Sequence, residues 1–126
     1  MAASGLPKPR ERHTNSIIHA ALDIRDYIEE AKTKNIHEGH PFFELRIGLN
    51  TGPIVAGIVG VKKFQYDIWG DTVNTASRME TSGVPGKVNI SQATYDILKD
   101  DPELVFEDRG KIKTKGKGEM QMYFVD

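Results

Sequence analysis

Residues 66–80, YDIWGDTVNTASRME, include an aspartate, an asparagine and an arginine whose spacing suits contact with a single ligand. If the second half of this stretch is a helix, Asn74 and Arg78 lie one turn apart on one face and can act together. Asp67 lies among aromatic and aliphatic residues, where a carboxylate needs hydrogen-bond donors. An amino group on a ligand base would be one such donor.

The same helix residues also have a plainer interpretation. Arg78 can pair with Glu80 or Asp71 on a solvated surface, and Asn74 is typical of the start of a helix. On spacing alone, both interpretations stay open.

A lysine-rich run near the C-terminus, residues 111–117, fits either a solvated strand edge or a phosphate site. Alternating lysines commonly protect an exposed strand edge. Lys115 differs because a glycine follows it, which allows close approach of the backbone to a bound group. Together with the residues above, this run predicts a polyanion or nucleotide site. Its predicted members are Arg46, Asp67, Asn74, Arg78 and Lys115.

Two other patterns carry less chemistry. Residues 51–60, TGPIVAGIVG, lack the Lys-Ser/Thr of a phosphate loop and the spacing of a dinucleotide fingerprint. They favour a packed strand with small side chains. His37 and His40 lie in a polar stretch without a convincing third ligand, so a metal site there is disfavoured.

The composition is that of one ordinary globular domain. The 126 residues fall within the range of about 100 to 200 typical of a single domain. With 38% hydrophobic residues, 28% charged residues and a net charge of -1, nothing points to nucleic acid or a membrane surface. The absence of cysteine suits a reducing compartment. No apolar run approaches the roughly 20 residues that span a bilayer, so we expect a cytoplasmic chain, or the cytoplasmic part of a larger protein.

Apolar periodicity, caps and breaker residues predict three helices, of which the second, ended by the Gly and Pro residues of 82–86, would hold Asn74 and Arg78. Spacings of three and four predict a long amphipathic helix capped by Thr14 or Asn15, and Ser91 is a good cap for a later one. The predicted helices span residues 13–34, about 72–81 and 92–98, with a loop at 35–41.

Alternation and turn residues predict the strands. The predicted strands span residues 42–49, 54–59, 67–69, 87–90, 104–108, 110–114 and 121–125, and residues 1–12 are expected to be a strand end and a loop. The tight turn Thr51-Gly52-Pro53 predicts that the first two of these strands form a hairpin. Helices and strands do not alternate regularly, so the predicted fold class is α+β.

Four blocks of the sequence resemble consecutive blocks of the class III adenylate and guanylate cyclases. The blocks are ELRIGLNTGPIVAGIVG, YDIWGDTVNTASRME, GVPGKVNISQATYDIL and RGKIKTKGKGEMQMYFV, and the resemblance runs from about residue 4 to residue 125. It implies a partial ferredoxin-like domain with an antiparallel-rich sheet and helices on one face. It also implies conversion of a nucleoside triphosphate to a 3′,5′-cyclic monophosphate and pyrophosphate, in a site shared by two head-to-tail domains.

The resemblance implies a role for each candidate residue. Asp67 matches the residue that accepts a hydrogen bond from the adenine amino group, where guanylate cyclases usually have cysteine or another residue. Asn74 matches the residue that orients the ribose, and Arg78 the one that stabilises charge on the phosphorus oxygens. Lys115 matches the triphosphate-binding lysine, and Arg46 an arginine that contacts the phosphates from the opposite subunit.

The sequence departs from the family pattern at its beginning. Cyclase domains begin with a strand motif like F-x-D-I-x-G-F-T, followed by a hairpin motif like K-T-I-G-D-A-Y-M, and neither motif is present in residues 1–126. Their two aspartates bind the metal ions, so we expect an N-terminally truncated single domain that is almost inactive by itself. Missing strands would leave unpaired edges and an uncovered apolar face, which predicts a dimer or a swapped assembly.

We therefore expect the substrate-binding and transition-state part of a class III adenylate cyclase. The substrate would be ATP, with Mg²⁺ or Mn²⁺ in the complete enzyme, and the partner a second copy or a second cyclase domain. One alternative is a guanylate cyclase, which Asp67 disfavours, because a carboxylate accepts hydrogen bonds and guanine O6 is also an acceptor. Another alternative is a non-catalytic nucleotide-binding or dimerisation module.

Overall fold

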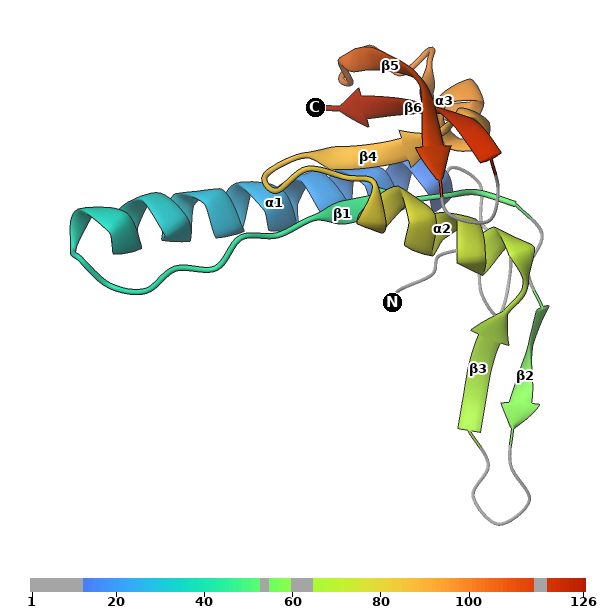
Figure 1. The fold of residues 1–126 in the computed structure, drawn as a ribbon, viewed down its shortest axis with the longest axis horizontal. Helices are drawn as coiled ribbons and strands as arrows, with labels where there is room; N and C mark the ends of the chain where they lie inside the picture. Colours follow the sequence, from blue (N-terminus) through green and yellow to red (C-terminus); the bar gives the residue numbers. More distant parts are fainter. Residues whose placement is uncertain (1–12, 53–54, 60–64, 115–117) are drawn as a thin grey trace.

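The computed structural model describes residues 13–52, 55–59, 65–114 and 118–126, with backbone only for residues 13, 55–59 and 65–69. The elements are α1 (His13–His37), β1 (Ile47–Leu49), β2 (Val55–Val59), β3 (Gln65–Trp69), α2 (Asp71–Thr81), β4 (Val88–Ser91), α3 (Gln92–Leu98), β5 (Phe106–Thr114) and β6 (Gly118–Val125) (Figure 1). The α+β class is confirmed. The expectation for residues 1–12 lies outside the described residues.

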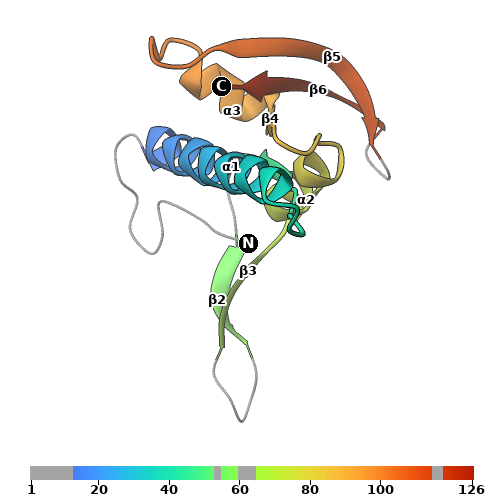
Figure 2. The ribbon, with the colours of Figure 1, turned by 90° about the vertical axis from the view of Figure 1, so that its left-hand side faces the viewer.

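Four strands form one sheet in the order β1-β4-β6-β5, and β2 and β3 form a separate two-stranded ribbon. β1 runs parallel to β4, with Leu49 opposite Ile90, whereas the other pairs are antiparallel. The prediction of a hairpin between the first two strands was wrong, because β2 pairs with β3 instead. Pairing with β4 lets β1 place Leu49 in the core, whereas the β2–β3 ribbon projects away from the sheet (Figures 1 and 2).

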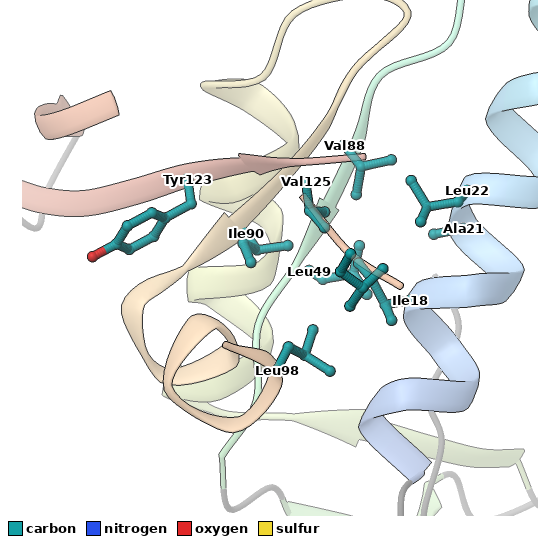
Figure 3. Packing of buried hydrophobic residues seen from close by; sticks show 10 residues of the cluster. Ile18, Ala21, Leu22, Leu49, Val88, Ile90, Leu98, Tyr123 and Val125 are labelled. Atoms are coloured by element: carbon teal, nitrogen blue, oxygen red, sulfur yellow. The ribbon is translucent and has the colours of Figure 1, made fainter. Parts of the chain in front are cut away.

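The hydrophobic core lies on one face of this sheet, under α1 and α3. Its buried members are Ile18, Ala21, Leu22, Leu49, Val88, Ile90, Leu98, Leu104, Tyr123 and Val125 (Figure 3). The pairs Val88–Val125 and Ile90–Tyr123 lie opposite each other in the sheet and point to the same side. The aromatic rings of Tyr95 and Tyr123 stack with their centroids 3.9 Å apart, which joins α3 to this core.

The second helix, α2, packs against the other face. Asn89 lies between two core residues of β4, so its side chain points away from the core, and it donates to the backbone oxygen of Met79 on α2 at 2.9 Å. Beside it, a Cβ on Gly48 would lie 2.0 Å from the nitrogen of Glu80. The helices expected on one face therefore lie on both faces. The close approach of α2 depends on the absence of a side chain at Gly48.

The helix predictions are confirmed with small shifts at the ends. α1 ends at His37, three residues beyond the prediction. Gly39 follows two residues later, with a φ of 74° that glycine adopts without strain. Basic residues in its last turn suit the negative end of the helix dipole. Thr14 and Asn15 lie inside the helix rather than at its cap. Ser91 caps α3 as predicted, and its side chain accepts from the nitrogen of Thr94.

The two strands predicted around residue 109 form one strand, β5, which pairs with β6 along its whole length. The register shifts between Asp108 and Gly110, so Arg109 is an extra residue in the ladder. Gly110 has a φ of 72°, and the carboxylate of Asp108 accepts from its nitrogen at 2.6 Å. This β-bulge changes the direction of the side chain at position 109.

Candidate functional site

Asn74 and Arg78 lie together on α2, as their spacing predicted. The Nη1 atom of Arg78 donates to the backbone oxygen of Asn74 at 3.2 Å. Asn74 is exposed and Arg78 half-buried, while Thr75 and Met79, each one position further along, form the buried side of the helix. α2 therefore presents an amide and a guanidinium next to each other at the protein surface.

The first turn of α2 is fixed by contacts with the sheet rather than by a capping side chain. Gly70 precedes the helix and supplies no side-chain cap, although Asp71 places a negative charge at the positive end of the helix dipole. The side-chain amide of Asn50 donates to the backbone oxygen of Thr72 at 3.0 Å. The hydroxyl of Ser91 donates to Asn50 Oδ1 at 2.6 Å. This chain of bonds connects the start of α2 to the start of α3.

Arg46, the residue before β1, binds the last turn of α2. Its Nε and Nη2 atoms lie 3.2 and 3.1 Å from Oε1 of Glu80. The sequence allows Glu80 as a partner of Arg78, and the structure shows Glu80 bound to Arg46. Arg78 and Glu80 are two residues apart and so point about 200° apart around the helix. Arg46 and Arg78 therefore lie on different sides of α2.

Asp67 lies in the middle of β3, where it is opposite Gly57 of β2. The structure describes its backbone but not its side chain. β3 ends at Trp69, and α2 begins two residues later, so the strand that holds Asp67 leads directly into the helix that holds Asn74 and Arg78. Lys115 lies outside the described residues, between the end of β5 at Thr114 and the start of β6 at Gly118.

Two residues that hold α2 in place, Asn89 and Arg109, were not singled out from the sequence. Nη1 of Arg109 donates to the backbone oxygen of Ser82 at 2.9 Å and to Oδ1 of Asn89 at 3.0 Å. Burial lowers the pKa of Arg109, and the charge of Glu107 partly offsets this effect. An asparagine between two apolar strand residues, as in VNI, was the available signal, because a buried amide needs partners.

The described residues around α2 do not form a two-metal site. Among the described residues, three metal-ligating side chains come together only at His19, Asp101 and Glu103. His19 is on α1 and the other two follow α3, on the opposite side of the sheet from α2. The aspartates that the cyclase resemblance implies as metal ligands are not among residues 1–126. These residues therefore do not supply a metal clamp for the candidate site.

Comparison with known proteins identifies the family. The family model for the adenylate and guanylate cyclase catalytic domain matches residues 1–126. The chain is 43% identical over 125 residues to an adenylate cyclase of Mycobacterium bovis, and 42% identical over 125 residues to the human guanylate cyclase soluble subunit beta-2. This chain belongs to the family of class III nucleotide cyclase catalytic domains.

A solved structure agrees with the fold. The guanylate cyclase domain of RhGC from Catenaria anguillulae, in complex with GTP, is 36% identical with a TM-score of 0.85, and the match covers 98% of this chain and 64% of that chain. The partial ferredoxin-like cyclase fold is thereby confirmed.

The matches to the two curated relatives cover 99% of this chain but only 27% of the Mycobacterium bovis protein and 20% of the human protein. Because one relative is an adenylate cyclase and the other a guanylate cyclase, the likeness does not choose between ATP and GTP. In the part of the chain that the structure describes, no helix is both long and apolar enough to cross a bilayer.

Proposed function

We propose that this chain is the substrate-binding and transition-state part of an adenylate cyclase, which converts ATP to 3′,5′-cyclic AMP and pyrophosphate. The observation that carries the proposal is the placement of Asn74 and Arg78 on one surface of α2, where the backbone oxygen of Asn74 accepts from Nη1 of Arg78 at 3.2 Å. The chain belongs to the cyclase family, and in a cyclase that surface would face the ribose and the reacting phosphate.

Each residue has a role that its chemistry can perform. The amide of Asn74 would hold the ribose so that its 3′-oxygen faces the α-phosphorus. Holding the reacting atoms in this geometry lowers the entropic part of the activation barrier. The guanidinium of Arg78 would bind the oxygens on which negative charge increases in the transition state. Lys115 would bind the triphosphate, since a lysine ammonium is a compact positive charge.

Asp67 supports ATP as the substrate. An ionised carboxylate only accepts hydrogen bonds, and the exocyclic nitrogen of adenine donates, whereas O6 of guanine accepts. The same carboxylate would repel the acceptor of guanine. Guanylate cyclase is the second candidate, because relatives named guanylate cyclases are 42% identical to this chain, against 43% for the adenylate cyclase.

The position of Arg46 supports a site shared between two domains. Arg46 lies on the side of α2 that carries Glu80, and Arg78 points to another side. To bind one triphosphate within a single chain, the guanidinium groups of Arg46 and Arg78 would have to reach it from different sides of α2. A second cyclase domain packed head to tail can supply Arg46 from its own chain, and this is the arrangement that we propose.

Divalent metal ions complete the chemistry of this family. Bound Mg²⁺ or Mn²⁺ would activate the attacking oxygen and neutralise the phosphates. Because the described residues around α2 do not fit such ions, we assign no ligand in this chain. The chain alone would bind and orient the nucleotide, with very little turnover. A nucleotide-binding or dimerisation module without activity is the corresponding alternative.

The test is a cyclase assay of the gene-length protein with ATP and with GTP, each with Mg²⁺ and with Mn²⁺. We expect a preference for ATP, and Asp67→Cys should reduce that preference by removing the acceptor for adenine. Arg78→Ala should lower kcat far more than it weakens ATP binding, because its role is in the transition state. A clear preference of the unmodified protein for GTP would contradict the assignment to ATP. Nucleotide binding without any turnover would favour the non-catalytic module.

A further inference from the structure

Arg109 forms a connection that neither its strand nor the cyclase family match explains. It is the extra residue at the bulge of β5, so it takes no part in the regular register of the β5–β6 ladder. Its side chain is half-buried and contacts the end of α2, β4 and β6. A bulge of this kind commonly serves to direct one side chain.

The guanidinium of Arg109 is held in three ways. Its Nη1 atom donates to the backbone oxygen of Ser82, the residue that follows α2, and to Oδ1 of Asn89 on β4. Its Cζ atom lies 4.2 Å from the ring centroid of Phe124 on β6, which is a cation–π distance. The burial that lowers the pKa of Arg109 fits a group held mainly by neutral acceptors.

Asn89 extends the connection into the helix. Its side chain is fully buried, accepts from Arg109 through Oδ1 and donates through Nδ2 to the oxygen of Met79 at 2.9 Å. The last four carbonyl groups of a helix have no partner within the helix. At the end of α2, the nitrogens of Ser82 and Gly83 donate to the backbone oxygens of Arg78 and Glu80, whereas the backbone oxygen of Met79 accepts from Asn89. Arg109 and Asn89 supply donors to Ser82 and Met79, on either side of the helix end.

We propose that Arg109 is a positioning residue, which acts through Asn89 to hold the C-terminal end of α2 in one place on the sheet. Arg78 lies one residue before Met79, so the contact that holds Met79 also sets the position of the Arg78 backbone. β5 leads from Arg109 to Thr114, directly before Lys115. Arg109 thereby joins the strand that leads to Lys115 to the helix that carries Asn74 and Arg78. Its effect on turnover rests on the proposed function, whereas its hold on α2 does not.

The first experiment measures the hold on α2 without any need for activity. Amide hydrogen exchange is followed in the gene-length protein and in the variants Arg109→Met and Arg109→Lys. Methionine keeps an apolar chain over Phe124 but donates nothing, so amides at residues 78–83 should exchange about tenfold faster or more. Lysine can still donate to both acceptors and should restore a large part of the protection.

Arg25→Met is the matched control. Arg25 is also a half-buried arginine with two partners, but these are Asp26 and Asp126, and it lies on α1 across the sheet from α2. Its replacement should leave exchange at residues 78–83 unchanged. Equal protection of these residues in the unmodified protein, Arg109→Met and Arg25→Met would overturn the proposal.

The second experiment measures kcat and KM for the nucleotide in a double-mutant cycle of Arg109→Met with Arg78→Lys. If Arg109 acts by positioning Arg78, Arg109→Met should lower kcat about tenfold in the unmodified background and much less beside Arg78→Lys. Factors that simply multiply would contradict a role through Arg78. If the gene-length protein produces no cyclic nucleotide, the proposed function fails, and hydrogen exchange alone then decides whether Arg109 holds α2.

Discussion

Arg46 and Glu80 form an ion pair that connects the start of β1 to the last turn of α2, with Nη2 and Oε1 3.1 Å apart. Both side chains are about half exposed, at 44% and 43%. Exposed pairs of this kind typically contribute only about 0.2 to 1 kcal/mol. A phosphate group can therefore displace Glu80 from Arg46 at a small cost, so the pair is compatible with Arg46 as a nucleotide ligand.

Glu80→Gln should strengthen nucleotide binding. The change removes the competing carboxylate from Arg46, and the expected gain is at most about fivefold in Kd, which corresponds to the upper limit for an exposed pair. The measurement is a binding titration of the gene-length protein at low and high salt, and the gain should shrink as salt rises. Glu30→Gln, an exposed change on α1, is the control. Weaker binding by Glu80→Gln would show that Glu80 supports the site.

Gly48→Ala should displace α2 from the sheet. A Cβ at this position would lie 2.0 Å from the nitrogen of Glu80 and 2.3 Å from the carbonyl carbon of Met79, and both are backbone atoms. Overpacking of this kind typically costs about 1 to 3 kcal/mol, and here we expect the upper end. Urea denaturation measures the loss. Gly83→Ala is the control, since its nearest contact would be 3.1 Å, and an equal loss in both variants would contradict the argument.

Ser91→Ala should lower stability by about 1 to 2 kcal/mol, because it removes the cap of α3. The same hydroxyl donates to Asn50, whose amide holds the first turn of α2, so the change should also loosen that turn. Thermal unfolding measures the stability, and hydrogen exchange at residues 71–75 measures the loosening. Ser77→Ala, at an exposed position of α2, should change neither.

Asn15→Ala should reduce the dependence of the free energy of unfolding on pH in the acid range. Asp101 has a pKa below its ordinary 3.8, first because it accepts from the nitrogen of Glu103, then because it accepts from Asn15, and through the charge of His19. The folded state thus binds this proton less readily than the unfolded state. The stabilisation is present above the ordinary pKa of 3.8 and is lost as the pH falls below it.

The measurement for this prediction is urea denaturation at several pH values between 7 and 3. The stability difference between the unmodified protein and Asn15→Ala should be largest near neutral pH and should shrink below about pH 4. Asn35→Ala, on the same helix but away from Asp101, is the control. A difference that grows as the pH falls would contradict the assigned sign.

Local patterns in the sequence were sufficient to predict the helices and most strands. The spacing of apolar residues predicted α1, the Gly and Pro residues of 82–86 predicted the end of α2, and Ser91 marked the start of α3. These signals were sufficient because caps, breakers and periodicity depend on residues within one or two turns. The same local spacing placed Asn74 and Arg78 on one face. The family was identified correctly from the sequence blocks, because those blocks are specific enough to be recognised without coordinates.

Only the tertiary structure decided how distant segments meet. The partner of β1 is β4, about 40 residues later, and not the neighbouring β2, because strand pairing depends on which apolar faces can be buried together. Tertiary packing also decided the partner of Arg46, the approach of α2 at Gly48 and the contacts of Arg109. Each joins segments far apart in the chain, so residue types and spacing determined the chemistry available, and packing across the sheet determined which groups hold α2.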